Sequence, residues 1–159
     1  MNTNLEAIRT AEFVDLPRFM GDWYVIGNIP TFIETEAFNA VETYALNVDG
    51  TVATTFAFNA GDFDGKRKTY HPKGFIRPGT GNAIWGMQFI WPFKAEYRVL
   101  YVDADYQTTI IGRSARDYLW IMSRQPAIPE ERFAELLRRV EADGYDLDKV
   151  RRVPQKWDQ

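Results

Sequence analysis

The strongest constraint on the fold is a series of short segments in which apolar and polar side chains alternate. Successive side chains of a β-strand point to opposite faces of a sheet, so this alternation is typical of strands. About eight such segments follow one another, separated by turn-forming residues: 19–28, 38–48, 51–59, 66–77, 83–91, 97–102, 107–113 and 118–124. Sequential strands joined by short turns predict an all-β fold, an eight-stranded antiparallel up-and-down barrel.

The first segment, 19–28, is apolar on both faces. Trp23 and Val25 share one face, and Tyr24 and Ile26 share the other. A strand that is apolar on both sides is covered on both sides, so this one belongs in the middle of a closed sheet. The residue at position 21 is glycine, which permits a tight bend or close packing beneath the indole.

Two connections between the segments carry specific information. Asp49-Gly50 lies between two alternating segments and predicts a tight β-hairpin. The connection 31–36 is longer and contains Phe32 and Ile33, which would either pack on the barrel or form a lid over a cavity entrance.

The apolar period changes from two to that of a helix after the last strand. Phe133, Leu136, Leu137 and Val140 follow the spacing i, i+3, i+4, i+7. We therefore predict an amphipathic helix over about 129–143. Its charges of both signs favour packing outside the barrel over a role as a membrane anchor. One domain, 1–159, is expected, with residues 1–16 as an N-terminal extension that crosses the outside of the fold.

Composition excludes several classes of function. The net charge is −3 and no basic stripe is interleaved with aromatic residues, so a nucleic-acid partner is not expected. The chain has no cysteine and a single histidine, His71, so neither a metal site nor a catalytic triad is supported. The acidic pairs Asp103/Asp105 and Glu34/Glu36 are interpreted as structural. We expect no catalytic residue, no metal and no cofactor.

Three stretches, in the same order along the chain, resemble the signature motifs of the lipocalin family. They are Gly21-Asp22-Trp23 on the first strand, residues 101–106, and residues 120–124, which end in Arg124. The middle motif departs from the usual Thr-Asp-Tyr, because Val102-Asp103-Ala104 keeps only Asp103. The resemblance covers residues 13–154 and is greatest to the bacterial lipocalins and to the apolipoprotein D and temperature-induced plant branch.

The resemblance implies a barrel with a cavity that is open at one end. The residues alone favour a filled core, whereas family barrels hold a ligand. The strand phases and the family pattern predict that the cavity is lined by Tyr44, Phe56, Phe58, Trp85, Met87, Phe89, Tyr97, Val99, Tyr101, Trp120 and Met122. Glu42 shares the phase of Tyr44, but the register of its strand leaves its direction open. Gly21, Trp23, Asp103 and Arg124 are structural, and the resemblance places the Arg124 guanidinium over the Trp23 indole at the closed end.

The expected function is to carry or store a small lipophilic ligand, such as a fatty acid or a lysophospholipid, in membrane lipid maintenance or stress. Two alternatives stand beside it: a lipocalin-fold enzyme that uses Glu42 or His71, and an interaction module with a filled barrel. The N-terminus lacks a signal peptide, although many bacterial relatives carry a lipoprotein signal and lipid anchor. The chain is therefore periplasmic and associated with the outer membrane if it is a processed form, and cytoplasmic otherwise, as a monomer or a homodimer.

Overall fold

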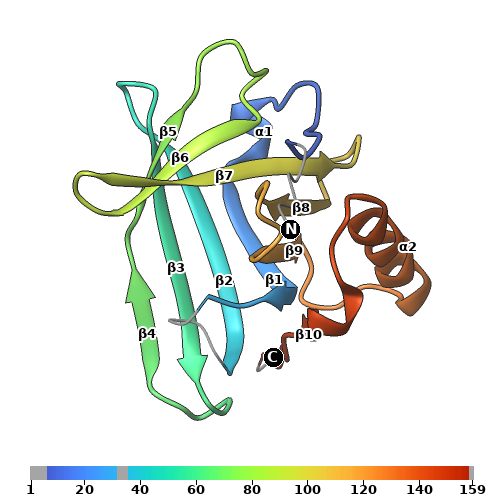
Figure 1. Ribbon diagram of the computed structural model, residues 1–159. Coiled ribbons are helices and arrows are strands. Elements are labelled where there is room, and N and C mark those ends of the chain that lie inside the picture. The colour runs from blue at the N-terminus through green and yellow to red at the C-terminus, as the bar shows by residue number, and fades with distance from the viewer. Residues whose placement is uncertain (1–6, 32–35, 158–159) are drawn as a thin grey trace, which may run out of the picture.

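The chain folds into an antiparallel sheet that closes on itself, with one helix packed outside it (Figure 1). The computed structural model describes residues 7–31 and 36–157. The strands are β1 (Gly21–Ile29), β2 (Ala37–Leu46), β3 (Val52–Ala60), β4 (Arg67–Tyr70), β5 (Lys73–Ile76), β6 (Ile84–Ile90), β7 (Phe93–Val102), β8 (Thr108–Gly112), β9 (Leu119–Ser123) and β10 (Arg151–Arg152). Around the barrel the strands pair in the order β1-β2-β3-β5-β6-β7-β8-β9, with β4 also paired to β3, and β9 pairs back onto β1, which closes the ring.

The eight-stranded barrel predicted from the sequence is confirmed, with one segment divided in two. The segment 66–77 forms β4 and β5, which both pair with β3 and so occupy one position in the ring. The break falls at His71-Pro72, where proline lacks the backbone N–H that a ladder needs and also restricts the residue before it. The two-residue strand β10 is an addition that pairs with Gly27 and Asn28 of β1.

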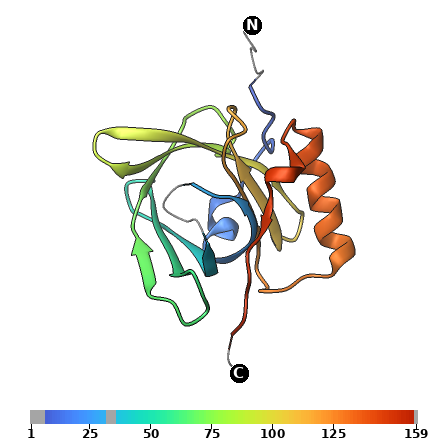
Figure 2. The same ribbon diagram turned by 60° about the horizontal axis from the view of Figure 1, so that its bottom comes forward.

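A short helix that the sequence did not predict closes one end of the barrel. Helix α1 (Leu16–Phe19) precedes β1, and the Asp15 side chain accepts a hydrogen bond from the Arg18 backbone N–H. Phe19 is fully buried in the barrel core. Figure 2, viewed from the side nearer the open end, shows α1 inside the ring of strands.

The C-terminal helix lies outside the barrel, as the sequence predicted. Helix α2 (Glu130–Ala142) buries Phe133, Leu136 and Val140 in a second apolar core, between the helix and the outer face of the sheet. Gly27 makes this close approach possible, since a Cβ atom there would lie 3.1 Å from the Phe133 ring. The short helix η1 (Leu147–Lys149) follows. Among the described residues, no helix is long and apolar enough to span a bilayer.

The described part of the N-terminal extension is bound to the barrel by hydrogen bonds. The backbone N–H of Ala11 donates to the Val99 carbonyl at 3.0 Å, and that of Val14 donates to the Gly81 carbonyl at 2.8 Å. Val14 is fully buried in the same core as Phe19. The extension therefore helps to seal the end of the barrel that α1 closes.

Candidate ligand-binding cavity

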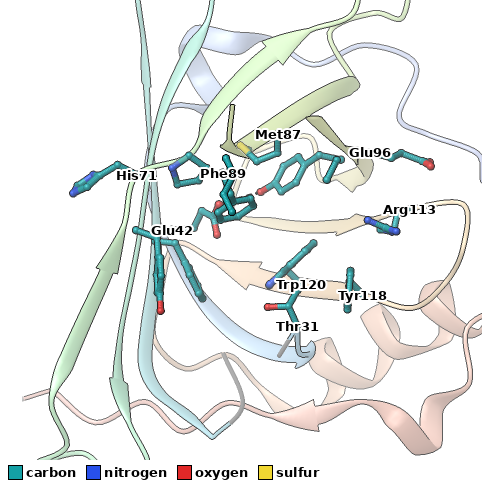
Figure 3. Close-up of a pocket in the computed structure, with 15 residues that line it drawn as sticks. Thr31, Glu42, His71, Met87, Phe89, Glu96, Arg113, Tyr118 and Trp120 are labelled. Carbon is teal, nitrogen blue, oxygen red and sulfur yellow. Dashed lines mark hydrogen bonds between the residues drawn. The ribbon is translucent and has the colours of Figure 1, made fainter. Parts of the chain in front are cut away.

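A cavity of about 410 Å³ occupies the half of the barrel away from α1 (Figure 3). Its wall comes from several strands, which bring together residues that lie far apart in the sequence. Five of the eleven residues predicted to line it do so: Phe56, Met87, Phe89, Tyr97 and Trp120. They belong to β3, β6, β7 and β9, and all but Phe89 are at least partly buried.

Four predicted lining residues lie instead in the packed core of the closed half: Tyr44, Trp85, Val99 and Met122. The prediction that they line the cavity is wrong, because aromatic side chains fill the barrel there. The Phe19 ring stacks on Tyr44, with centroids 5.3 Å apart, and meets Trp85 edge-on at 5.9 Å. The filled-core alternative thus describes one half of the barrel and the cavity the other.

Phe58 is also absent from the cavity wall, for a different reason. Its side chain is only 1% exposed, and neighbouring rings cover it. The Tyr70 ring stacks against it with centroids 6.2 Å apart, and Phe56 lies 5.4 Å away. Tyr70, which was not predicted, takes a place in the lining instead.

Tyr101 was predicted to face inward and lies on the outer face of the barrel. The pairing of β7 with β8 shifts register between Val99 and Tyr101, and such an irregularity reverses the faces of the residues beyond it. The Tyr101 hydroxyl accepts a hydrogen bond from Arg132 of α2 at 2.9 Å, and the Arg139 guanidinium lies 3.9 Å from its ring centroid. Tyr101 therefore helps to attach α2 to the barrel.

At the closed end, the Arg124 guanidinium carbon lies 3.7 Å from the centroid of the Trp23 ring. The Trp23 indole N–H donates to the Phe19 carbonyl at 2.9 Å. Arg124 donates to the carbonyls of Asp22 and Arg18, at 2.9 and 2.8 Å, so it ties β1 to α1. This combination of a cation–π contact and satisfied carbonyls closes the barrel base.

The other two residues of the signature motifs, Gly21 and Asp103, stabilise the local conformation of the backbone. Gly21 has a φ of +98°, a conformation that disfavours other residues, and a Cβ atom there would lie 3.3 Å from the Arg124 guanidinium. The Asp103 carboxylate accepts hydrogen bonds from the backbone N–H groups of Gln107 and Thr108, at 2.6 and 3.0 Å. It therefore holds the turn between β7 and β8.

The Glu42 carboxylate and the Tyr97 hydroxyl lie at the cavity wall, and the Tyr44 hydroxyl contacts Tyr97 from the packed core. Glu42 faces inward and lines the cavity, although it is only 5% exposed. The Tyr97 hydroxyl donates to Glu42 Oε1 at 3.2 Å, and the Tyr44 and Tyr97 hydroxyls are in direct contact. Burial raises the pKa of Tyr44 and of Tyr97 well above the ordinary value, so both hydroxyls keep their protons at neutral pH.

The mouth of the cavity contains Arg113 and Glu96, which the sequence did not assign to the site, and His71, which only the enzyme alternative assigned to it. Arg113 pairs with Asp117 at 2.8 Å, and the Glu96 carboxylate accepts hydrogen bonds from Ser114. His71 also lines the cavity, and its Nδ1 lies 3.4 Å from the Thr55 hydroxyl. Within residues 7–31 and 36–157, no three side chains of metal-ligating type come together.

Some missed lining residues carried a usable signal in the sequence. Ala95 has the phase of Tyr97, and Tyr118 has the phase of Trp120, so both belong to inward faces already identified. Thr31, Tyr70, His71, Pro72 and Arg113 lie at the ends of strands, where alternation does not assign a face. The two apolar residues proposed for a lid, Phe32 and Ile33, lie outside the described residues.

The hairpin between β6 and β7 exposes a group of large apolar side chains beside the cavity. Phe89, Ile90, Trp91 and Phe93, which we call the apolar tip, are 51, 72, 81 and 75% exposed. Phe89 and Ile90 also line the cavity, so the apolar tip is continuous with its mouth. Figure 1 shows this hairpin projecting from the side of the barrel opposite α2.

Comparison with known proteins agrees with this architecture. A family model described as a lipocalin-like domain matches residues 14–155. The chain is 32% identical to temperature-induced lipocalin-1 from Arabidopsis thaliana, over 96% of this chain and 86% of the relative. It is 29% identical to the outer membrane lipoprotein Blc of Escherichia coli K12, over 85% of this chain and 76% of the relative.

Solved structures agree on the fold. Insecticyanin from the tobacco hornworm Manduca sexta superimposes with a TM-score of 0.76 at 15% identity, over all of this chain and 89% of that one. Apocrustacyanin A1 from lobster superimposes with a TM-score of 0.70 at 12% identity, over 99% of this chain and 94% of that one. At these identities the likeness concerns the barrel and not the ligand.

Proposed function

Because the chain belongs to the lipocalin-like family, whose members bind small hydrophobic ligands, we propose that it carries or stores a single-chain lipid in its barrel cavity. A fatty acid or a lysophospholipid is the leading class of ligand. The cavity in the open half of the barrel is the observation that carries this proposal.

The shape and lining of the cavity support an apolar ligand. Its volume of about 410 Å³ is in the range of small-molecule sites. The walls are largely aromatic, with Phe56, Tyr97 and Trp120 among them, and Met87 adds a flexible, polarisable surface. Burial of apolar area contributes about 25 cal/mol per Å², against which the lost freedom of the ligand must be set.

Ligand binding can be followed through the protein's own fluorescence, because Trp120 lines the cavity. We expect titration with hexadecanoate or with lysophosphatidylcholine to change the tryptophan emission to a saturating value at one ligand per chain. A titration that produces no saturable change with either lipid would contradict the proposal.

The apolar tip supports a membrane surface as the source of the ligand. Exposed apolar patches of this kind mark interaction sites, and aromatic side chains favour the interface between water and lipid. Since Phe89 and Ile90 belong to both the tip and the cavity mouth, a lipid could pass between them without crossing water. This contact would suit a role in membrane lipid maintenance.

Removing the apolar tip should weaken membrane binding. The double variant Trp91→Ser, Phe93→Ser is expected to lower partitioning onto zwitterionic lipid vesicles at least about 10-fold, because two exposed aromatic side chains no longer insert. Co-sedimentation with the vesicles measures this.

The matched control replaces two apolar side chains that are exposed elsewhere. Leu46, the last residue of β2, and Val48, in the turn between β2 and β3, are 44 and 109% exposed. The variant Leu46→Ser, Val48→Ser should partition like the unmodified chain. Equal losses in both double variants would show that the tip has no special part in membrane binding.

We also propose that the cavity binds its ligand without converting it. The two candidate catalytic residues have other contacts: Glu42 accepts a hydrogen bond from Tyr97, and exposed His71 lies near Thr55. The family generally consists of binding proteins. An enzymatic role would require turnover of a lipophilic substrate that is lost in Glu42→Gln or in a His71 variant.

A further inference from the structure

The polar group of Glu42 lies at the inner end of the cavity. On β2, Glu42 pairs with Trp23 of β1, whose indole closes the barrel base, and with Phe56 of β3. Tyr44, two residues further along β2, is already in the packed core. Figure 3 shows Glu42 on one side of the cavity, with Arg113 and Tyr118 on the other.

Hydrogen bonds hold this carboxylate as an acceptor. Tyr97 donates to Glu42 Oε1 at 3.2 Å, and since that uses the Tyr97 proton, the contact between the two hydroxyls has Tyr44 as its donor. A carboxylate offers about four acceptor positions, so Glu42 can also accept from a ligand while it keeps the bond from Tyr97.

Aromatic rings line the cavity around this acceptor. Phe56 pairs with Glu42 across the β2–β3 ladder, and the Tyr97 and Trp120 rings have centroids 5.8 Å apart. The faces of aromatic rings attract cations, and the Glu42 carboxyl oxygens accept hydrogen bonds from donors. The basic residue among the described lining of the mouth, Arg113, is paired with Asp117. The inner end is thus suited to a cation or a hydrogen-bond donor.

We propose that Glu42 selects, among single-chain lipids, those whose inserted end carries an ammonium or a hydroxyl group. This inference rests on the proposed function, lipid binding in the cavity, and narrows its ligand class. An ammonium group donates to the carboxylate and lies among the rings, and a hydroxyl group makes the hydrogen bond without the charge. A fatty acid inserted with its carboxylate inward would place two acceptors face to face.

Three probes with the same chain test this selection: tetradecylamine, tetradecanol and tetradecanoic acid. Their affinities at neutral pH are measured by tryptophan fluorescence on the full chain. We expect the amine to bind at least about 10-fold more tightly than the acid, with the alcohol between them. In Glu42→Gln, the affinity for the amine should fall at least about 10-fold, and the affinity for the acid should not fall.

Two further variants test whether the selection among the probes depends on Glu42 in particular and not on any loss of a carboxylate. Glu130→Gln changes a carboxylate outside the cavity lining, which Arg152 contacts, and should keep the order of the probes. Tyr97→Phe keeps the ring and removes the hydroxyl that holds Glu42, and should reduce the preference for the amine. This second variant decides the matter if Glu42→Gln fails to fold.

The outcomes distinguish a failure of the proposed role of Glu42 from a failure of lipid binding in the cavity. If the unmodified chain binds the acid as tightly as the amine, or if both Glu42→Gln and Tyr97→Phe keep the original order, the role of Glu42 is overturned while lipid binding stands. If the unmodified chain binds none of the three probes, the proposed function falls and this inference falls with it.

Discussion

Replacing Ala95 by tryptophan is expected to weaken lipid binding strongly while the barrel stays folded. Ala95 lines the cavity on β7, opposite Met87 of β6, and is exposed to it. An indole at this position occupies space that a lipid chain would fill, and no core side chain is removed. The affinity for a single-chain lipid, measured by tryptophan fluorescence, should fall at least about 10-fold.

Ala53→Trp provides the matched control. Ala53 is exposed on β3 and is absent from the cavity lining. The same bulky residue on this outward face should leave the affinity unchanged, and both variants should keep the far-ultraviolet circular dichroism of the unmodified chain. Unaltered binding by a folded Ala95→Trp variant would mean that lipid binds elsewhere.

Truncating Trp23 to alanine should strongly destabilise the folded chain. The side chain is fully buried, packs on Phe19 with ring centroids 5.2 Å apart, and is covered by Arg124. Replacing a buried tryptophan by alanine typically costs about 3–5 kcal/mol. In a chain of this size, each kcal/mol lowers the unfolding midpoint by about 2–4 °C, so a fall of roughly 10 °C is expected.

Trp91→Ala removes the same atoms from a side chain that is 81% exposed. Its unfolding midpoint in thermal circular dichroism should lie within about 2 °C of that of the unmodified chain, since exposed positions contribute little to stability. If Trp23→Ala unfolded at the same temperature as Trp91→Ala, Trp23 and its contact with Arg124 would contribute little to the stability of the fold.

Alternation was sufficient to predict the barrel, because each strand has one face in the core and one outside it. The segments that form β2, β3 and β6 match their predicted positions closely. Helix α2 was equally clear, since its apolar stripe packs on the outer face of the sheet. The division of β4 from β5 follows from Pro72, whose effect on a ladder is local and readable.

The depth of the cavity could not be predicted from alternation. A pattern of period two identifies inward faces but does not say where along the barrel the interior is filled. That depends on Phe19, which comes from a four-residue helix too short to show a period, and on Tyr70, which covers Phe58. Met122 belongs to the same packed core as Phe19 and is fully buried, so Met122→Arg would test the fold and not the ligand site.

The prediction that Tyr101 faces inward was wrong because alternation also does not reveal irregularities in strand pairing. A strand that is regular throughout would put Tyr97, Val99 and Tyr101 on one side, and the register shift after Val99 moves Tyr101 to the other. Both Leu100 and Tyr101 thus face the outer core with α2. Nothing in the local sequence marks this irregularity, because Val, Leu and Tyr all suit a strand.

The most direct test of a lipid in the barrel is native mass spectrometry of the freshly purified chain, followed by organic extraction of the same sample. We expect a population heavier than the 18.4 kDa chain by the mass of one lipid, and that lipid in the extract. Ala95→Trp should lack the heavier population. An unmodified chain that shows only its own mass, and still only its own mass after incubation with long-chain lipids, would contradict the account of a lipid-binding cavity.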